Sequence, residues 1–165
     1  MSLASVRAFF AANAPDIDVL ESELSSATVT LAAQAYGVAP ERIAKTLSLR
    51  VGDRVVLIVT KGTARLDNKK AKAVFGGKPR MLALEEVVAL TGHPVGGVCP
   101  FGLATPLQIY CDISLREFDE VVPAAGSINS AVRISPQRMA ELCAAEWVDV
   151  CQDATQLAQE NLAAG

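Results

Sequence analysis

Apolar and polar residues alternate along residues 42–49, a pattern typical of a strand with one buried face. Residues 55–60 follow as a β-branched apolar run, which also favours a strand. Between these two stretches lies Val51-Gly52-Asp53-Arg54, a turn-forming sequence. The pattern therefore predicts an antiparallel hairpin in the first third of the chain.

Helical spacing of apolar residues recurs in five places. It predicts helices over residues 3–12, 28–36, 67–75, 84–90 and 135–145. We expect Ser25 or Ser26 to cap the second helix and Gly37 to end it. Further short strands are predicted over residues 17–22, 107–112, 120–123, 131–134 and 147–150.

The short connections favour hairpins over crossovers, so we expect an α+β fold with a mixed, mostly antiparallel sheet. A length of 165 residues, 51% of them hydrophobic, suits one compact domain. We assign residues 1–151 to this domain and residues 152–165 to a tail. No apolar run is long enough to cross a bilayer, and the N-terminus lacks the layout of a signal peptide, so a cytoplasmic location is expected.

The four cysteines form no CxxC pair, and His93 is the single histidine, so no metal site is expected. The net charge of −3 argues against a general nucleic-acid coat. Seven of the fifteen basic residues nevertheless lie within residues 61–80, against the one acid Asp67. This basic segment is either a phosphate-binding surface or a solvated helix face balanced by acids brought close in the fold. The candidate phosphate contacts are Lys61, Arg65, Lys69, Lys70 and Lys72.

Lys45 is the most unusual residue of the predicted hairpin. It falls on the same strand face as Ile43, Leu47 and Leu49. Burying an ammonium without a partner is costly, so the side chain either extends out to solvent or lines a pocket and faces a ligand.

A second unusual feature is the segment of residues 91–102, with four glycines and two prolines. Glycines let a main chain approach a ligand closely, and successive N–H groups can converge on one oxygen atom. The spacing fits neither GxxxxGK[ST] nor a GxGxxG unit, which argues against nucleotide-triphosphate or dinucleotide binding. An ordinary surface loop is one alternative, and a nucleophile built from Cys99 and His93 is another.

These residues together resemble the YbaK/EbsC family of trans-editing aminoacyl-tRNA deacylases, which are related to the editing domain of prolyl-tRNA synthetase. The resemblance rests on residues 42–47, 96–102, 126–127 and 131–134, and it runs over residues 19–151. It implies a barrel-like sheet whose pocket holds the 3′ end of a mischarged tRNA. It also implies no cofactor, and as partners tRNA(Pro) and prolyl-tRNA synthetase, with the chain a monomer or a homodimer.

By the same resemblance, Lys45 would contact the aminoacyl-adenosine end and Thr46 would line the amino-acid pocket. Gly96, Gly97 and Pro100 would hold the ester for hydrolysis. The further residues implied in substrate binding are His93, Val98, Cys99, Phe101, Gly126 and Ser127. We expect hydrolysis without a covalent intermediate, assisted by Lys45 and backbone N–H groups.

The Lys-Thr pair at positions 45 and 46 resembles family members that remove cysteine from tRNA(Pro), whereas alanine-specific members tend to have Lys-Asn. The chain departs from the pattern near residues 130–134, where Arg133 stands in a stretch that carries an aspartate in YbaK-type proteins. This leaves open an alanyl, seryl, threonyl or non-protein aminoacyl ester. A non-catalytic module that binds tRNA or a synthetase also stays open.

Overall fold

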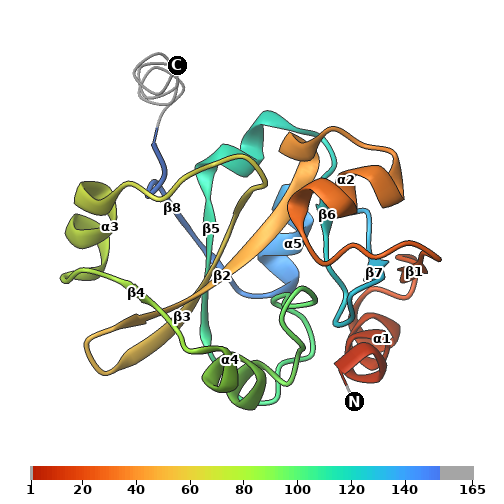
Figure 1. The fold of residues 1–165 in the computed structure, drawn as a ribbon, viewed down its shortest axis with the longest axis horizontal. Helices are drawn as coiled ribbons and strands as arrows, with labels where there is room; N and C mark the ends of the chain where they lie inside the picture. Colours follow the sequence, from red (N-terminus) through yellow and green to blue (C-terminus); the bar gives the residue numbers. More distant parts are fainter. Residues whose placement is uncertain (1, 153–165) are drawn as a thin grey trace.

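The computed structural model describes residues 2–152, and the predicted hairpin forms the centre of the fold (Figure 1). β2 (Ile43–Val51) pairs antiparallel with β3 (Arg54–Lys61) along its whole length. In this register Lys45 lies opposite Thr60, and Leu49 lies opposite Val56.

Four further strands complete a six-stranded sheet. They are β4 (Arg80–Met81), β5 (Gln108–Asp112), β6 (Val122–Pro123) and β8 (Glu146–Val148). The order is β4-β2-β3-β5-β8, and β6 pairs with the start of β2. A separate two-stranded sheet joins β1 (Leu20–Glu21) to β7 (Ser130–Ala131).

The mixed α+β class is confirmed, but parallel pairing is more extensive than the short connections indicated. β2–β6, β3–β5 and β5–β8 are parallel, whereas β2–β3, β2–β4 and β1–β7 are antiparallel. The chain crosses over from β3 to β5 and again from β5 to β8, and each crossover contains at least one helix. Parallel neighbours require such crossovers, so short loops between elements did not imply hairpins.

Five α-helices surround the sheet within residues 2–152, close to the predicted places. They are α1 (Ser2–Asn13), α2 (Val29–Tyr36), α3 (Asn68–Phe75), α4 (Leu84–Thr91) and α5 (Pro136–Leu142). Two short 3₁₀ helices, η1 (Pro40–Arg42) and η2 (Ile113–Glu117), precede β2 and follow β5. The N-cap of α2 is Thr28, whose hydroxyl accepts from the N–H of Leu31 at 3.2 Å, and neither Ser25 nor Ser26 takes that place.

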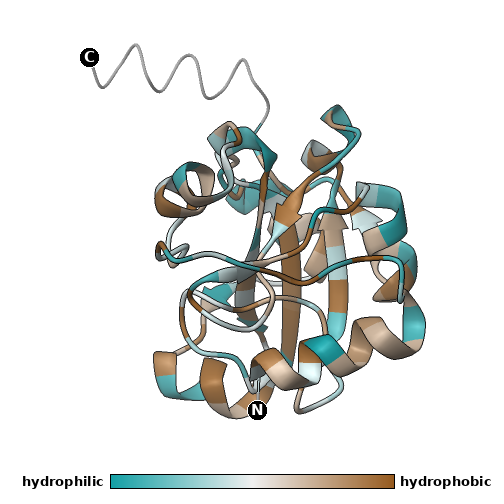
Figure 2. Ribbon diagram, turned by 90° about the vertical axis from the view of Figure 1, so that its right-hand side faces the viewer, coloured by the Kyte–Doolittle hydropathy of each residue, from teal (hydrophilic) through white to brown (hydrophobic). Residues whose placement is uncertain are grey.

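Each face of the sheet has its own apolar core, and Figure 2 shows the central strands as the most hydrophobic part of the molecule. Leu57 and Val59 pack with residues of α1 and α5, whereas Val56 and Ile58 pack with residues of α3. A third cluster joins α2 to Ile43 at the start of β2. Successive side chains of β3 point to opposite faces of the sheet. The continuous apolar run of β3 therefore contributes to the core on both faces, between two layers of helices.

Within residues 2–152, no helix is both long and apolar enough to cross a membrane. The tail assigned to residues 152–165 lies, from residue 153 onward, outside the described part of the chain.

Candidate functional site

A pocket of about 260 Å³ opens beside β2. Its wall is contributed by α2 and the residues before it, by β2, by the start of α4, by the glycine-rich loop, and by β6 and β7. Lys45, Thr46 and Ser48 of β2 lie on one side, with Gly96 and Val98 of the loop also in the wall. The fold therefore brings the two unusual features of the sequence to one cavity.

The pocket lies at a gap in the outer edge of β2. β6 pairs with Ile43 and Ala44, and β4 pairs with Leu49 and Arg50, so residues 45–48 have no strand partner on that side within the described part of the chain. The carbonyl oxygen of Ser48 accepts from the N–H of Leu82, which shows that it points away from β3. Since every second residue of a strand presents its backbone groups to the same side, the N–H and C=O of Thr46 face the gap.

Lys45 combines a pocket-lining position with an anchored ammonium. Its Nζ donates to the carbonyl oxygen of Ala64 at 2.6 Å, beyond the end of β3. Burial lowers the pKa of this ammonium below its ordinary value of 10.5, the nearby Cys151 thiol opposes that shift, and the charge of Arg65 adds to it. Of the two alternatives for Lys45, a side chain extended to solvent or one that lines a pocket, the structure thus agrees with the second.

Thr46 contributes a buried hydroxyl to the same region. Among the described residues, its Oγ1 has no hydrogen-bond partner, although the residue lines the pocket. Ser48, two residues further along β2, is buried and lines the pocket as well. A buried polar atom without a partner costs free energy, so such atoms at a pocket wall indicate a place where a ligand can bond.

The glycine-rich loop packs tightly against the loop that precedes β7. The carbonyl oxygen of Gly97 accepts from the N–H of Gly126 at 3.1 Å. A Cβ atom at Gly97 would lie 2.8 Å from the backbone of Ser127, and one at Gly96 would lie 2.9 Å from the Cβ of Ala27. Glycine is therefore required at both positions by the close approach of another chain segment. Gly97, Gly126 and Ser127 support the pocket wall without forming it.

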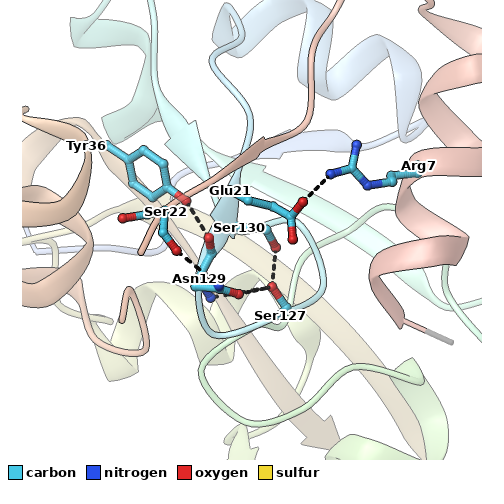
Figure 3. A network of polar contacts seen from close by, with 7 residues as sticks. All are labelled: Arg7, Glu21, Ser22, Tyr36, Ser127, Asn129 and Ser130. Carbon is cyan, nitrogen blue, oxygen red and sulfur yellow. Dashed lines mark hydrogen bonds and ion pairs between the residues drawn. The ribbon is translucent and has the colours of Figure 1, made fainter. Parts of the chain in front are cut away.

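Behind this wall lies a polar network shown in Figure 3. The Oγ atoms of Ser127 and Ser130 lie 2.6 Å apart, and Ser127 Oγ donates to Asn129 Oδ1 at 2.9 Å. The hydroxyl of Tyr36 donates to the carbonyl oxygen of Asn129 at 2.9 Å, and Asn129 Nδ2 donates to that of Ser22. Ser130 and Tyr36 line the pocket.

Tyr36, Ser48 and Ser130 line the pocket although no sequence pattern singled them out. Ser48 shares a strand face with Thr46, and this spacing could have indicated it. Tyr36 and Ser130 come from α2 and β7, and only the tertiary structure places them at the same wall.

Three residues of the glycine-rich loop that are implied in substrate binding are buried in the protein and do not line the pocket. His93, Cys99 and Phe101 are fully buried, and Phe101 packs on Phe9 and Phe10 of α1. His93 Nε2 donates to the carbonyl oxygen of Phe101 at 2.7 Å, and Cys99 Sγ lies 3.5 Å from the same nitrogen. Direct ligand contact by these side chains is therefore not supported, because the apolar core holds them.

The paired Cys99 and His93 also lack the electrostatics of an activated nucleophile. Burial raises the pKa of the Cys99 thiol to about 12, while burial lowers the pKa of His93. A neutral thiol beside a neutral imidazole is a packing contact. Pro100 is buried as well and begins a bend that runs to Gly102.

The basic segment contains both ion-paired lysines and exposed side chains. Lys61 Nζ lies 3.0 Å from Glu117, and Lys70 Nζ lies 3.0 Å from Asp149. Arg65, Lys69 and Lys72 are exposed, the last two on α3. Acids from other parts of the fold thus balance part of the segment. Among residues 2–152, no three His, Cys, Asp or Glu side chains cluster to hold a metal ion.

Comparison with known proteins agrees with this geometry. Residues 25–142 match the model of the aminoacyl-tRNA editing domain. The chain is 51% identical over 155 residues to YwhH of Bacillus subtilis, an uncharacterized protein, covering 93% of this chain and 99% of that one. It is 29% identical over 133 residues to EbsC of Enterococcus faecalis, described as a candidate Cys-tRNA(Pro)/Cys-tRNA(Cys) deacylase, covering 79% of each chain.

A solved structure described as a candidate trans-editing enzyme for prolyl-tRNA synthetase superposes with a TM-score of 0.85 at 33% identity, covering 92% of this chain and 98% of that one. The family model spans well over half of the chain, and the fold agrees with that of the solved structure. The chain belongs to the aminoacyl-tRNA editing domain family, in the YbaK/EbsC group that its sequence resembles.

Proposed function

We propose that this protein hydrolyses the ester bond of mischarged aminoacyl-tRNA in trans, with cysteinyl-tRNA(Pro) as the leading substrate. The observation that carries the proposal is the meeting of Lys45, the gap in β2 and the glycine-rich loop in one pocket. A volume of about 260 Å³ suits an amino acid joined to part of a ribose, and it excludes the bulk of a tRNA.

The chemistry requires positioning and charge stabilisation more than a strong nucleophile, because an aminoacyl ester is already activated. Water attacks the carbonyl carbon, the bond to the ribose oxygen breaks, and that oxygen takes up a proton. Lys45 is the candidate for stabilising the developing oxyanion, since within residues 2–152 its ammonium makes one hydrogen bond, to Ala64, and has three N–H donors.

The backbone offers further groups of the right kind. The N–H of Val98 donates to no other backbone group among residues 2–152, and Val98 lines the pocket. The outward-facing C=O of Thr46 in the gap of β2 suits the positively charged α-amino group of the substrate. A covalent route through Cys99 is disfavoured by the burial of its thiol.

The pocket wall is mostly aliphatic, with the hydroxyls of Thr46, Ser48 and Ser130 among its apolar side chains, and this mixture suits a small substrate side chain that carries one polar or thiol group. Thr46 brings a buried hydroxyl without a partner among the described residues, and Ser48 and Ser130 bring two more hydroxyls. The name of EbsC points to cysteine for that relative, and the Lys-Thr pair of this chain agrees with it. Seryl and threonyl esters are the nearest alternatives, and the alanyl ester lacks a group for these hydroxyls to bind.

The test is hydrolysis of cysteinyl-, seryl-, threonyl- and alanyl-tRNA(Pro) under single-turnover conditions, with Lys45→Ala as the inactive control. Rapid loss of the cysteinyl ester that disappears in the variant supports the proposal. Faster loss of another ester moves the substrate assignment to that amino acid. If no ester is hydrolysed while tRNA still binds, the protein is a binding module and the proposal fails.

A further inference from the structure

The first turn of α1 touches both loops that surround the pocket. The hydroxyl of Ser5 lies 3.0 Å from the carbonyl oxygen of Gly102, at the end of the glycine-rich loop, and 2.8 Å from that of Ser2, so its one proton is shared between these two acceptors. The hydroxyl of Ser2 donates to the carbonyl oxygen of Gly126, in the loop before β7. Two side chains one helical turn apart thus bind two segments that are 24 positions apart in the sequence.

Both contacts are tight at the level of the backbone. A Cβ atom at Gly102 would lie 2.7 Å from the carbonyl oxygen of Ser5, and one at Gly126 would lie 2.7 Å from that of Ser2. Both glycines have positive φ, +59° and +92°. Two glycines therefore allow α1 to approach where any side chain would push it away.

Aromatic packing adds a third contact further along α1. The ring of Phe101, next to Gly102, lies 4.7 Å from that of Phe10 between centroids. Beyond these anchors, the two loops are joined to each other by the bond from Gly126 N–H to the carbonyl oxygen of Gly97. α1 is thus connected to Gly96 and Val98 through one loop, and to Ser130 through the other.

We propose that the first turn of α1 is a positioning element that holds these two loops at a fixed separation through the hydroxyls of Ser2 and Ser5. This inference rests on the proposed function in one respect, namely that the separation sets the discrimination between aminoacyl esters. α1 lies outside residues 25–142, the part that matches the editing-domain model, so this positioning role is not part of that match.

Discrimination is sensitive to such positioning because small differences between side chains are worth little binding energy. One methylene changes the rate ratio of two esters by only about 10- to 200-fold in a well-fitted pocket. If the pocket wall can move, the rate ratio between two esters falls before the turnover of the best ester does. Ser2 and Ser5 do not line the pocket, so they act through the loops alone.

The test compares Ser2→Ala/Ser5→Ala with Asn13→Ala in the full chain. Asn13 is a matched control because its side chain donates to the carbonyl oxygen of Phe9 within α1 itself, at 2.8 Å. The first measurement is amide hydrogen exchange in residues 96–102 and 126–130, with the amides of β3 as internal reference. We expect about five-fold faster exchange in both loops for each hydrogen bond removed, unchanged β3, and no change in Asn13→Ala.

The second measurement is the rate ratio between the best and second-best ester. We expect this ratio to fall about three- to ten-fold in the double variant and to recover in Ser2→Thr/Ser5→Thr, which keeps both hydroxyls. An equal slowing of all esters would reduce α1 to a general stabilising role and overturn the inference. If the double variant does not fold, Ser5→Ala carries the same comparison.

The two proposals can fail separately. A parent protein that hydrolyses no ester refutes the proposed function, and the exchange measurement then still decides whether α1 holds the loops. Unchanged exchange in both loops overturns the positioning role whether or not any ester is hydrolysed.

Discussion

The ammonium of Lys45 is anchored by the carbonyl oxygen of Ala64 at 2.6 Å, across the end of the β2–β3 hairpin. Ala64 itself is buried, and its N–H donates to the carbonyl oxygen of Lys61 in a turn at the end of β3. The turn that leads into the basic segment therefore fixes where the charge of Lys45 lies. A substrate would meet an ammonium already held in place, which lowers the cost of ordering it.

Replacing Lys45 by methionine should separate activity from stability. We expect deacylation to fall at least about 100-fold, because the oxyanion loses its charged donor. The free energy of unfolding should stay the same or rise, since a half-buried charge gives way to an apolar chain of similar length. Single-turnover rates and thermal melts check this, with Lys78→Met as the control. A marked loss of stability would instead make Lys45 structural.

The lowered pKa of Lys45 predicts a pH effect of definite sign. If the ammonium form is needed, the enzymatic rate falls as the pH rises through the lowered pKa, below 10.5. The free energy of unfolding should rise with pH between the lowered pKa and 10.5, because the unfolded chain binds more protons there than the folded one. The rate of Lys45→Ala is subtracted at each pH to remove spontaneous ester hydrolysis. A rate that stays level up to pH 10.5 would rule out a role for the charge.

Gly97→Ala should disable the site through a collision of backbones. The added Cβ would lie 2.8 Å from the backbone of Ser127, so the two loops must separate. Gly77→Ala is the matched control, because its Cβ would lie 3.6 Å from the side chain of Val51, an ordinary contact. We expect deacylation of the best ester to fall at least about ten-fold in the first variant and to change little in the second. Equal rates in the two variants would show that the pocket tolerates separation of the loops.

Thr46→Val tests whether the buried hydroxyl serves the ligand. The substitution is nearly isosteric and removes a polar atom that has no partner among the described residues. We expect the free energy of unfolding to rise by about 1 kcal/mol. We also expect the rate ratio of cysteinyl over alanyl ester to fall several-fold. A raised stability with an unchanged ratio would show that the hydroxyl does not contact the substrate.

The exposed lysines of α3 should contribute to tRNA affinity by binding phosphates. Lys69→Gln/Lys72→Gln should raise the Michaelis constant and lower the slope of log affinity against log salt by about 1 for each phosphate that is no longer bound. Arg138→Gln, outside the basic segment and paired with Asp16, is the control. An unchanged slope would make this part of the segment a solvated helix face.

Much of the local structure follows from the sequence. The hairpin, five helices and the glycine that ends α2 come from short-range patterns, since turn residues and apolar spacing act within a few positions. Lys45 could be selected because a charge breaks the apolar alternation of its own strand. Gly96 and Gly97 could be selected because glycine is unusually dense in that stretch of the chain.

Contacts between distant segments were decided by the tertiary structure. The parallel pairing of β3 with β5 depends on a crossover through α3 and α4, and the gap in β2 depends on where β4 and β6 stop. Neither leaves a local signal, since strand partners are chosen by packing across the whole sheet. His93 and Phe101 share the loop of Gly96, yet both are buried, because Phe101 packs against α1 and His93 Nε2 donates to the carbonyl oxygen of Phe101. The sequence thus identifies residues with unusual chemistry, while long-range packing determines which of them reach the pocket.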